Sequence, residues 1–398
     1  MKHLILQILL LSTAFLFSIT TKVIHVNATS NSSSGSSANP AVLCLPGIYI
    51  NDPGDCTPSG PSMYLTQMAK IGITFPMTPL PASQADPSLA QMDIHYGEVM
   101  TENAPIYPSV EVALEKKKKL ASERINASFA YISYDRSEEV DSGRFYYTGR
   151  GWMTAADVSR IGVLPRFQGL TFNRTPNNSF GWILTFLSAT PVETKRTPGS
   201  QIADHTGHLL TEYEVIQIYD VATVDDSNWY MVGPDEWLPE KVVSRVTPDT
   251  TPPEGVIGDR WIAINLDQQT IAVYDQRQLV FATVIASGSE PFWTQPGLFP
   301  IYEKHEKTPM RGAFEADGGG GYYLEDVPWT MYFDQARALH GAYWRTKMGF
   351  SQSHGCVNMT VGDAHWIFNW ANIGDPVYVW DPTGQTPTDP SLYSSGGY

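Results

Sequence analysis

The C-terminal third of the chain contains three strand-like stretches, and in the first two of them polar and apolar residues alternate. The first two form "RWIAINLDQQTIAVYD" (260–275), and the third is "QLVFATVIASG" (278–288). A period of two places successive side chains on opposite faces of a β-strand. The Asp-Gln-Gln turn between the first two stretches predicts a hairpin, so this region is expected to open an antiparallel β-sheet.

One short helix is expected beyond these strands. Thr360 and Asp363 have the spacing of a capping box, and they introduce the stretch "DAHWIFNWAN". Gly374 supplies an end signal, and "PVYVWD" (376–381) alternates like a final strand. The sequence therefore predicts a mainly β domain with a short helix near its C-terminal end.

Upstream of this domain the chain contains a repeat. "FYYTGRGWMTAADV" (145–158) and "WYMVGPDEWLPEKVV" (229–243) share an aromatic residue, a tyrosine, a glycine, a tryptophan and a valine at similar spacing. The pattern predicts two copies of one small β unit. It resembles the small β-barrels of the bacterial Src-homology-3 type that accompany many cell-wall enzymes. Trp152 and Trp237 are expected to be core residues of these units rather than platforms for ligand stacking.

The N-terminus has the layout of a secretory signal. Lys2 precedes an apolar run from Leu4 to Ile19, and Ala28 is a small residue suited to cleavage. The run is close to the lower limit of about 17 residues for a membrane span, so an uncleaved anchor stays an alternative. The flexible linker "TSNSSSGSSANP" after Ala28 favours cleavage. We therefore expect an exported, extracytoplasmic protein.

These features predict seven segments. The clearest boundary is the proline-rich stretch "TPDTTPPEG", after which the strand pattern of the last domain begins. The expected segments are a signal peptide (1–28), a Ser/Gly linker with a loop-rich segment (29–61), a first barrel-like repeat (90–165), a loop with a second barrel-like repeat (166–246), the hinge (247–256), a C-terminal β domain (257–382) and a polar tail (383–398).

The charge of the chain limits its partners. It carries 41 acidic and 26 basic residues, and its net charge of −15 becomes −17 without residues 1–28, which hold two lysines and no acid. Nucleic acids and anionic membranes attract basic surfaces. The composition therefore argues against both as partners.

Three cysteines in an exported chain leave one without a disulfide partner. Cys44 and Cys56 bracket the turn-rich segment "CLPGIYINDPGDC" and are the natural disulfide pair. Cys356 is then the odd thiol. A free cysteine is usually a buried structural residue, so a function for it needs further support.

The surroundings of Cys356 supply that support. It lies in "SHGCVN" (353–358), and His340 precedes it by sixteen residues in "ALHGAYW". A histidine can activate a thiol, and glycine beside it lets backbone N–H groups approach a developing oxyanion. His340 is a candidate base, held by a backbone carbonyl rather than a carboxylate. A metal site of His340, His354 and Cys356 is the alternative, but His-x-Cys spacing is poor for chelation. The residues favour catalysis without a metal.

The whole stretch "HGAYWRTKMGFSQSHGCVNM" (340–359) resembles the active-site signature of the L,D-transpeptidases, the YkuD-type catalytic domain. The likeness extends from about Ile257 to Asp381. It implies a mostly β fold with the cysteine in a narrow tunnel, with Cys356 as the nucleophile, His340 as its base and no cofactor.

The resemblance also implies supporting roles around the nucleophile. His354 would support the site, and the N–H groups of Gly355 and Cys356 would form the oxyanion hole. Further support positions are Ser353, Gly341 and Asn358, which stands where many members have arginine. The walls or lid of the pocket would comprise Trp329, Tyr332 and the loop Gly318–Tyr323, including Tyr323.

The function implied is transfer of a peptidoglycan stem peptide. The cysteine would form a thioester with the stem tetrapeptide, release D-Ala and pass the acyl group to an amine, which cross-links the wall. Two alternatives remain at this point, an L,D-carboxypeptidase and a non-catalytic wall-binding protein. Contact of the upstream repeats with wall glycan is a further expectation.

Overall fold

The computed structural model describes residues 61–74, 77–161, 169–187, 191–200, 204–313 and 321–393. The expected signal peptide, the linker and the pair Cys44 and Cys56 lie outside these ranges. Within them, no helix is both long and apolar enough to cross a membrane.

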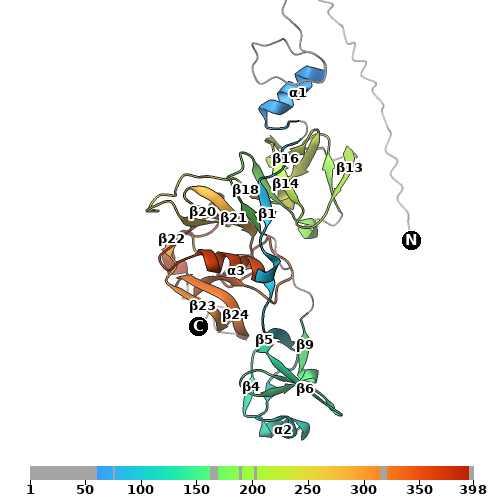
Figure 1. Ribbon diagram of the computed structural model, residues 1–398, viewed down its shortest axis with the longest axis vertical. Coiled ribbons are helices and arrows are strands. Elements are labelled where there is room, and N and C mark those ends of the chain that lie inside the picture. Colours follow the sequence, from blue (N-terminus) through green and yellow to red (C-terminus); the bar gives the residue numbers. More distant parts are fainter. Residues whose placement is uncertain are drawn as a thin grey trace, which may run out of the picture.

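Two large sheets form the centre of the molecule (Figure 1). Sheet A comprises, in spatial order, β1 (Ala82–Gln84), β10 (Leu170–Phe172), β21 (Gln278–Val284), β20 (Thr270–Asp275), β19 (Trp261–Asn265), β27 (Pro376–Trp380) and β22 (Gly297–Pro300). Sheet B comprises β26 (Val357–Met359), β25 (Arg337–Gly341), β24 (Gly321–Asp334), β5 (Phe129–Tyr134), β2 (His95–Val99) and β9 (Val158–Arg160), with β23 (Glu303–Ala313) also paired to β24.

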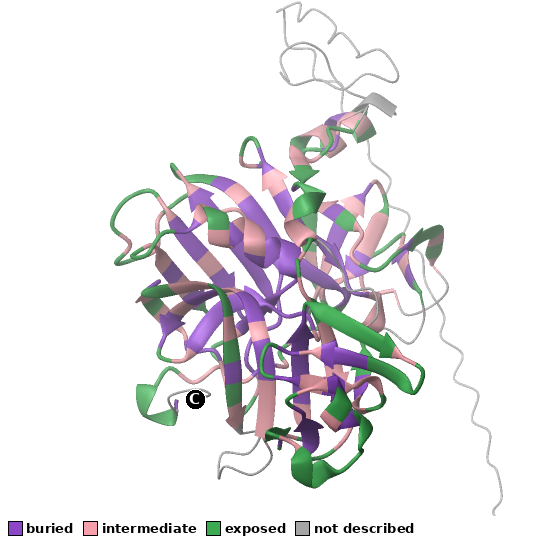
Figure 2. Ribbon diagram, turned by 60° about the horizontal axis from the view of Figure 1, so that its bottom comes forward, coloured by how far each residue is buried: buried purple, intermediate pink, exposed green. Residues whose placement is uncertain are grey.

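A shared core lies between the two sheets and helix α3 (Val361–Trp370), where the ribbon is mostly buried (Figure 2). Ile271 and Val273 of β20 meet Met331 and Leu339 of sheet B there. Residues of β20 alternate between this core and the opposite face of sheet A, as period two requires. β20 is thus buried on both faces.

The predicted hairpin and helix are present. β19 and β20 pair antiparallel with Asn265 opposite Thr270, and the Asn265 carboxamide oxygen accepts hydrogen bonds from the backbone N–H groups of Asp267 and Gln268. That Asx turn closes the hairpin. Thr360 caps α3 by accepting a hydrogen bond from the backbone N–H of Asp363.

Two smaller groups of strands, the first unit (residues 95–160) and the second unit (residues 179–246), lie at opposite ends of the elongated molecule (Figure 1). The first unit adds to β2, β5 and β9 the strands β3 (Ala104–Ile106), β4 (Glu123–Ile125), β6 (Arg136–Val140), β7 (Gly143–Tyr147) and β8 (Trp152–Thr154), with helix α2 (Val110–Leu114). The second unit comprises β11 (Ser179–Ile183), β12 (Val192–Lys195), β13 (His205–Leu210), β14 (Val215–Ile218), β15 (Asp220–Val224), β16 (Ser227–Gly233), β17 (Glu236–Pro239) and β18 (Val243–Val246).

The remaining helices are short. Helix α1 (Pro61–Lys70) precedes β1. The single-turn 3-10 helices are η1 (Pro87–Ala90), η2 (Lys118–Leu120), η3 (Ala155–Asp157), η4 (Thr185–Leu187), η5 (Glu240–Val242) and η6 (Pro390–Leu392).

The mainly β prediction is confirmed, but none of the described upstream sheets closes into a barrel. The repeat has the same local structure in both copies, a strand, a tryptophan-bearing strand, a 3-10 turn and a further strand. Trp152 and Trp237 are only half-buried, which differs from the expected core position. Their neighbours Met153 and Leu238 are fully buried instead, because alternation along the strand turns the next side chain inward.

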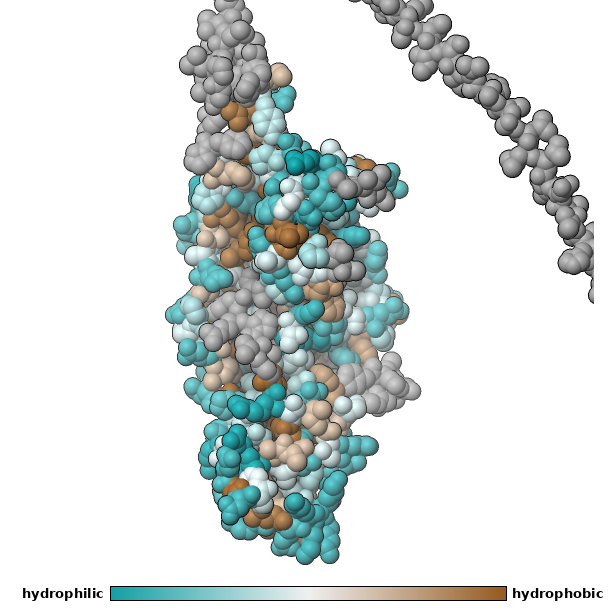
Figure 3. Space-filling model, turned by 90° about the vertical axis from the view of Figure 1, so that its right-hand side faces the viewer, coloured by the Kyte–Doolittle hydropathy of each residue, from teal (hydrophilic) through white to brown (hydrophobic). Residues whose placement is uncertain are grey.

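The surface view in Figure 3 shows hydrophilic residues over most of one face of the described molecule. Hydrophobic residues appear there as small, separate groups distributed along the long axis. Single apolar residues of this kind are normal on a protein surface.

Candidate active site

Two neighbouring strands of sheet B position the motif residues. β25 and β26 pair in parallel, with His340 opposite Asn358. Cys356 stands two residues before Asn358, so extended geometry places both side chains on the same face as His340. The fifteen residues between His340 and Cys356 form the crossover that makes a parallel pair possible.

These side chains line one cavity of about 230 Å³. Its walls include His340, His354, Cys356, Ser353 and Asn358. The structure therefore brings together the predicted nucleophile, its predicted base and three of the predicted supporting residues.

His340 is buried and has a defined tautomer. Its Nδ1 lies 3.2 Å from the carbonyl oxygen of Gly341, which can only accept, so Nδ1 carries the proton and Nε2 keeps its lone pair. Burial lowers the pKa of His340 to about 4, against the raising effect of the Gly341 hydrogen bond. The imidazole is therefore neutral at physiological pH, the form that a general base requires. A backbone carbonyl orients it, as the sequence predicted.

The Cys356 thiol is also neutral at rest. Burial raises its pKa, while a backbone hydrogen bond with Ala338 and the charge of Arg337 act in the opposite direction. Its Sγ lies 3.8 Å from the carbonyl oxygen of Ala336. Because the thiol and the imidazole that line this cavity are both neutral, a proton that passes between them moves when the sulfur attacks a substrate, rather than beforehand.

Gly355 cannot be replaced without strain. Its φ is +102°, and a Cβ there would lie 2.9 Å from Nε of Arg337. Arg337 is buried and fixed by an ion pair with Asp334 at 2.9 Å, so it has little room to move. The glycine in the motif thus allows the cysteine loop to pass close to a buried arginine.

Ser353 and Asn358 hold the backbone of Cys356. Ser353 Oγ donates to the Cys356 carbonyl and accepts from the N–H of Gly355 at 3.2 Å. Asn358 Nδ2 donates to the carbonyls of Ala286, at 3.2 Å, and Cys356, at 3.5 Å. The Gly355 N–H, one of the two expected oxyanion donors, therefore has an internal partner in this structure.

His354 lines the cavity and is itself half-buried. Its ring centroid is 4.7 Å from that of Phe292 and 5.3 Å from that of Tyr322. Burial, followed by the charge of Arg345, lowers its pKa. Within the described part of the chain, no group of three or more His, Cys, Asp or Glu side chains could hold a metal ion.

Of the residues expected at the pocket wall, Tyr322 of the loop lines the cavity, whereas Trp329, Tyr332 and Tyr323 do not. Tyr332 nevertheless packs in the same hydrophobic cluster as Cys356. Trp329 stacks on His365 with ring centroids 3.6 Å apart, and Tyr332 packs beside Tyr302. Tyr323 lines a neighbouring groove. Residues 318–320 of the expected lid lie outside the described ranges, while its last residues begin strand β24.

Gly341 also makes a close approach, because a Cβ there would lie 3.1 Å from both Pro328 Cγ and Val361 Cα.

Sequence reasoning missed six residues that line the cavity: Phe129, Met310, Leu324, Trp344, Arg345 and Gln352. Tyr322 also lines it and belongs to the loop 318–323 that was expected at the pocket. Trp344 and Arg345 stand inside the quoted motif and could have been selected there. Tyr322 directly precedes Tyr323, and only the register of β24 decides which of two adjacent tyrosines faces the cysteine. Phe129 comes from the first unit, and no local signal marks it.

The family of this region follows from its match to a family model. Residues 259–379 match the model of the L,D-transpeptidase catalytic domain, YkuD. These residues are a domain of the YkuD L,D-transpeptidase family. No curated protein matches the chain.

Solved structures of L,D-transpeptidases are also similar to this chain. The catalytic domain of the Enterococcus faecium L,D-transpeptidase, solved by NMR, has 26% identity and a TM-score of 0.29, covering 32% of this chain and 100% of that one. A crystal structure of a mutant of the E. faecium enzyme has 25% identity, covering 31% and 50%, with a TM-score of 0.29. Mycobacterium tuberculosis L,D-transpeptidase 1 has 19% identity, covering 30% and 60%, with a TM-score of 0.25. The match thus spans about half the length of the E. faecium mutant chain.

Proposed function

We propose that this L,D-transpeptidase domain cross-links peptidoglycan stem peptides through a thioester on Cys356. One observation carries the proposal: within a domain of this family, His340 and Cys356 line one cavity. His340 presents an unprotonated Nε2, because its Nδ1–H is donated to Gly341. This is the pairing that a cysteine nucleophile requires.

In the first half-reaction, Sγ of Cys356 attacks the carbonyl carbon of the third stem residue, a diamino acid. The thiol proton passes to Nε2 of His340 as the C–S bond forms. The C–N bond to D-Ala then breaks, and His340 gives the proton to the leaving amine. The products are D-Ala and a thioester.

In the second half-reaction, an amine of another stem attacks the thioester carbonyl. The C–N bond forms, the C–S bond breaks, and the amine proton returns through His340 to the sulfur. We propose the backbone N–H of Cys356 as an oxyanion donor, joined by that of Gly355 when it leaves Ser353 Oγ. Each such donor stabilises the transition state by about 3 kcal/mol in comparable sites.

The state of the thiol is testable by itself. Because burial raises the pKa of Cys356, alkylation of this thiol by iodoacetamide should accelerate with rising pH and show no plateau in acid. Intact-mass measurements of the chain beside Cys356→Ala would isolate this cysteine from the other two. A fast, pH-independent rate below neutrality would mean a preformed thiolate–imidazolium pair and would contradict the proposed proton transfer.

The decisive experiment incubates the full chain with tetrapeptide muropeptides and follows the products by mass spectrometry, beside Cys356→Ala. Loss of D-Ala with formation of a cross-linked dimer in the wild type alone is the expected result. Loss without a dimer would indicate a carboxypeptidase. Absence of both adduct and product with every diamino-acid stem would refute catalysis and favour a wall-binding protein.

The location follows from the same proposal. L,D-transpeptidases act on the cell wall outside the cytoplasm, and we propose that residues 1–28 direct export, followed by a linker, two β units and the catalytic domain. Contact of the two β units with wall glycan is proposed as well. Fractionation of cells producing the chain, with and without residues 1–28, tests export, since only the longer form should leave the cytoplasm.

A further inference from the structure

A second hollow lies beside the catalytic cavity, between the first unit and the hairpin of β23 and β24. Its volume is about 510 Å³. Arg124 and Arg150 line it from the first unit, and Arg311 lines it from β23. We call it the arginine groove. Three guanidinium groups in one groove stand out in a chain whose net charge is −15.

Two of these arginines have no carboxylate partner among the described residues. Arg150 is bound by Glu123 and by Glu325, with Nη2 at 2.5 Å from the latter. No described carboxylate lies within 4.0 Å of Arg124 or Arg311, and both side chains are exposed. The groove therefore keeps positive charge available for a ligand.

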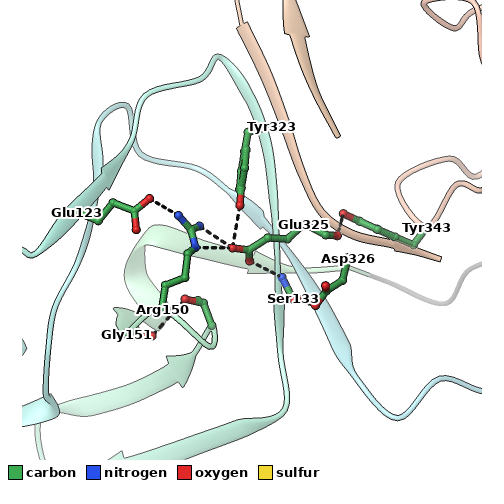
Figure 4. A network of polar contacts seen from close by, with 9 residues as sticks. Glu123, Ser133, Arg150, Gly151, Tyr323, Glu325, Asp326 and Tyr343 are labelled. Atoms are coloured by element: carbon green, nitrogen blue, oxygen red, sulfur yellow. Dashed lines mark hydrogen bonds and ion pairs between the residues drawn. The ribbon is translucent and has the colours of Figure 1, made fainter. Parts of the chain in front are cut away.

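A polar network fixes the wall that the first unit provides (Figure 4). Glu325 of β24 accepts hydrogen bonds from the Arg150 side chain, at 2.8 Å, from Tyr323, at 3.1 Å, and from the backbone N–H of Ser133, at 3.0 Å. Ser133 also donates to Asp326 at 2.6 Å. Since β5 pairs in parallel with β24, the network ties this wall to sheet B.

The arginine groove and the catalytic cavity share one lining residue. Tyr322 lines both, and its ring lies 5.3 Å from that of His354. Gly312 on β23 permits this position, because a Cβ there would lie 2.6 Å from the Tyr322 ring. Burial raises the pKa of Tyr322, and the charge of the Cys356 sulfur, once it is deprotonated, raises that pKa further, which places the sulfur near the ring. A ligand in the groove would therefore end close to the nucleophile.

We propose that the arginine groove binds the carboxylate of the acceptor peptide, with Arg124 and Arg311 as its ligands, and directs the peptide's amine past Tyr322 to the thioester. The inference rests on the proposed transpeptidation. Arginine suits this task because its planar donors match a carboxylate. A polyanionic wall polymer is the alternative ligand, because Arg124 also donates to the carbonyl oxygen of Lys118 in the lysine run 116–119, and the test separates the two.

The test separates the two half-reactions of the full chain. Donor tetrapeptide first loads Cys356, and the rate of D-Ala release is recorded. Two tripeptide acceptors then compete, identical except for a C-terminal carboxylate or carboxamide. The wild type should use the carboxylate form with about tenfold higher kcat/KM, the value of one charged hydrogen-bonding contact. The double variant Arg124→Gln/Arg311→Gln should lose this preference while D-Ala release stays unchanged.

A matched control and two contrary results make the outcome unambiguous. Arg277→Gln, at the exposed turn after β20, should keep the preference. Equal use of both acceptors by the wild type, or a preference that survives in the double variant, would overturn the inference and leave transpeptidation intact. If poly(glycerol phosphate) competes in the wild type only and the acceptor preference survives, the groove binds a polymer instead. Absence of D-Ala release in the wild type would refute the proposed function itself.

Discussion

The two upstream units contain copies of the same repeat, yet they meet the catalytic domain differently. Each unit has one strand that is buried on both faces, β5 in the first and β11 in the second. In β5, Ala130 and Ile132 face the unit's own core, while Phe129 and Tyr131 face the catalytic side.

In the second unit, β11 divides its side chains in the same way. Ile183 packs in the unit's own core, whereas Phe180 and Trp182 pack against the outer face of sheet A. The strand makes no ladder with sheet A and instead lies on its face. The second unit also contacts the crossover between the motif histidines, through Tyr213 and Met348.

The difference shows that one local motif can serve two kinds of docking. Backbone pairing of β5 with β24 fixes the first unit in register, so Phe129 enters the wall of the catalytic cavity. Face packing of β11 buries large side chains and stabilises the domain, but it brings none of that unit's residues to the lining of this cavity. We therefore expect changes at the first interface to be able to alter activity as well as stability, and changes at the second to alter stability alone.

The largest effect is expected from Trp182→Ala in the second unit. Trp182 is 1% exposed, and removing a buried tryptophan leaves a cavity that costs about 4 kcal/mol of unfolding free energy. Urea denaturation would measure it, with Trp380→Ala, a partly exposed tryptophan, as the control for a small loss. The folded variant should keep its kcat, and a large fall in kcat at full folding would contradict the division between the two units.

Arg150→Gln should destabilise the first interface by about 2 kcal/mol, less than a fully buried pair because Arg150 is partly exposed. Burial already raises the pKa of Glu325, and losing the arginine raises it further. The loss of unfolding free energy is therefore complete above the pKa that Glu325 has in the variant. It disappears as the pH falls through the pKa of Glu325, because a protonated Glu325 needs no cation.

Urea midpoints measured from about pH 8 down to about pH 4 would show this trend in the Arg150 variant. Arg144→Gln, which removes the exposed pair with Glu139, should leave the midpoint unchanged throughout. A loss that is constant across the pH range would show that Glu325 is not the responsible group.

Two tyrosines allow a matched comparison of the interfaces. Tyr96 donates to the carbonyl of Asp326 at 2.8 Å, and Tyr213 both donates to and accepts from the Met348 backbone. Tyr96→Phe and Tyr213→Phe should each cost about 1 kcal/mol, with Tyr213→Phe the larger because it also leaves a backbone N–H unpaired. The reverse order in thermal unfolding would mean that the first interface is the stronger contact.

The smallest effect is expected from Phe129→Ala in the first unit. The ring is half-buried at the cavity wall, so its loss should raise KM about threefold, or roughly 0.7 kcal/mol, with little change in stability. Phe186→Ala is the matched control, because this partly buried ring of the second unit packs on Phe350 away from the cavity. An equal change in KM for both variants would remove the distinction between the two units.

Much of the local structure was predictable from the sequence. The hairpin of β19 and β20 and the cap of α3 were found from alternation and from Thr360, because both signals act over a few residues. The order of His340, His354 and Cys356 was readable for the same reason, since the motif is continuous. Trp152 and Trp237 were misplaced because a one-residue step along a strand reverses the face.

The sequence by itself thus determined a mainly β chain with a cysteine–histidine motif and the start and end of its short helix. Only the tertiary structure decided that Tyr322 rather than Tyr323 faces the cavity and that β5 joins sheet B. The reason is that strand pairing is settled by side chains far apart in the chain. Ser133 and Glu325, 192 residues apart, meet by a hydrogen bond that no local pattern predicts.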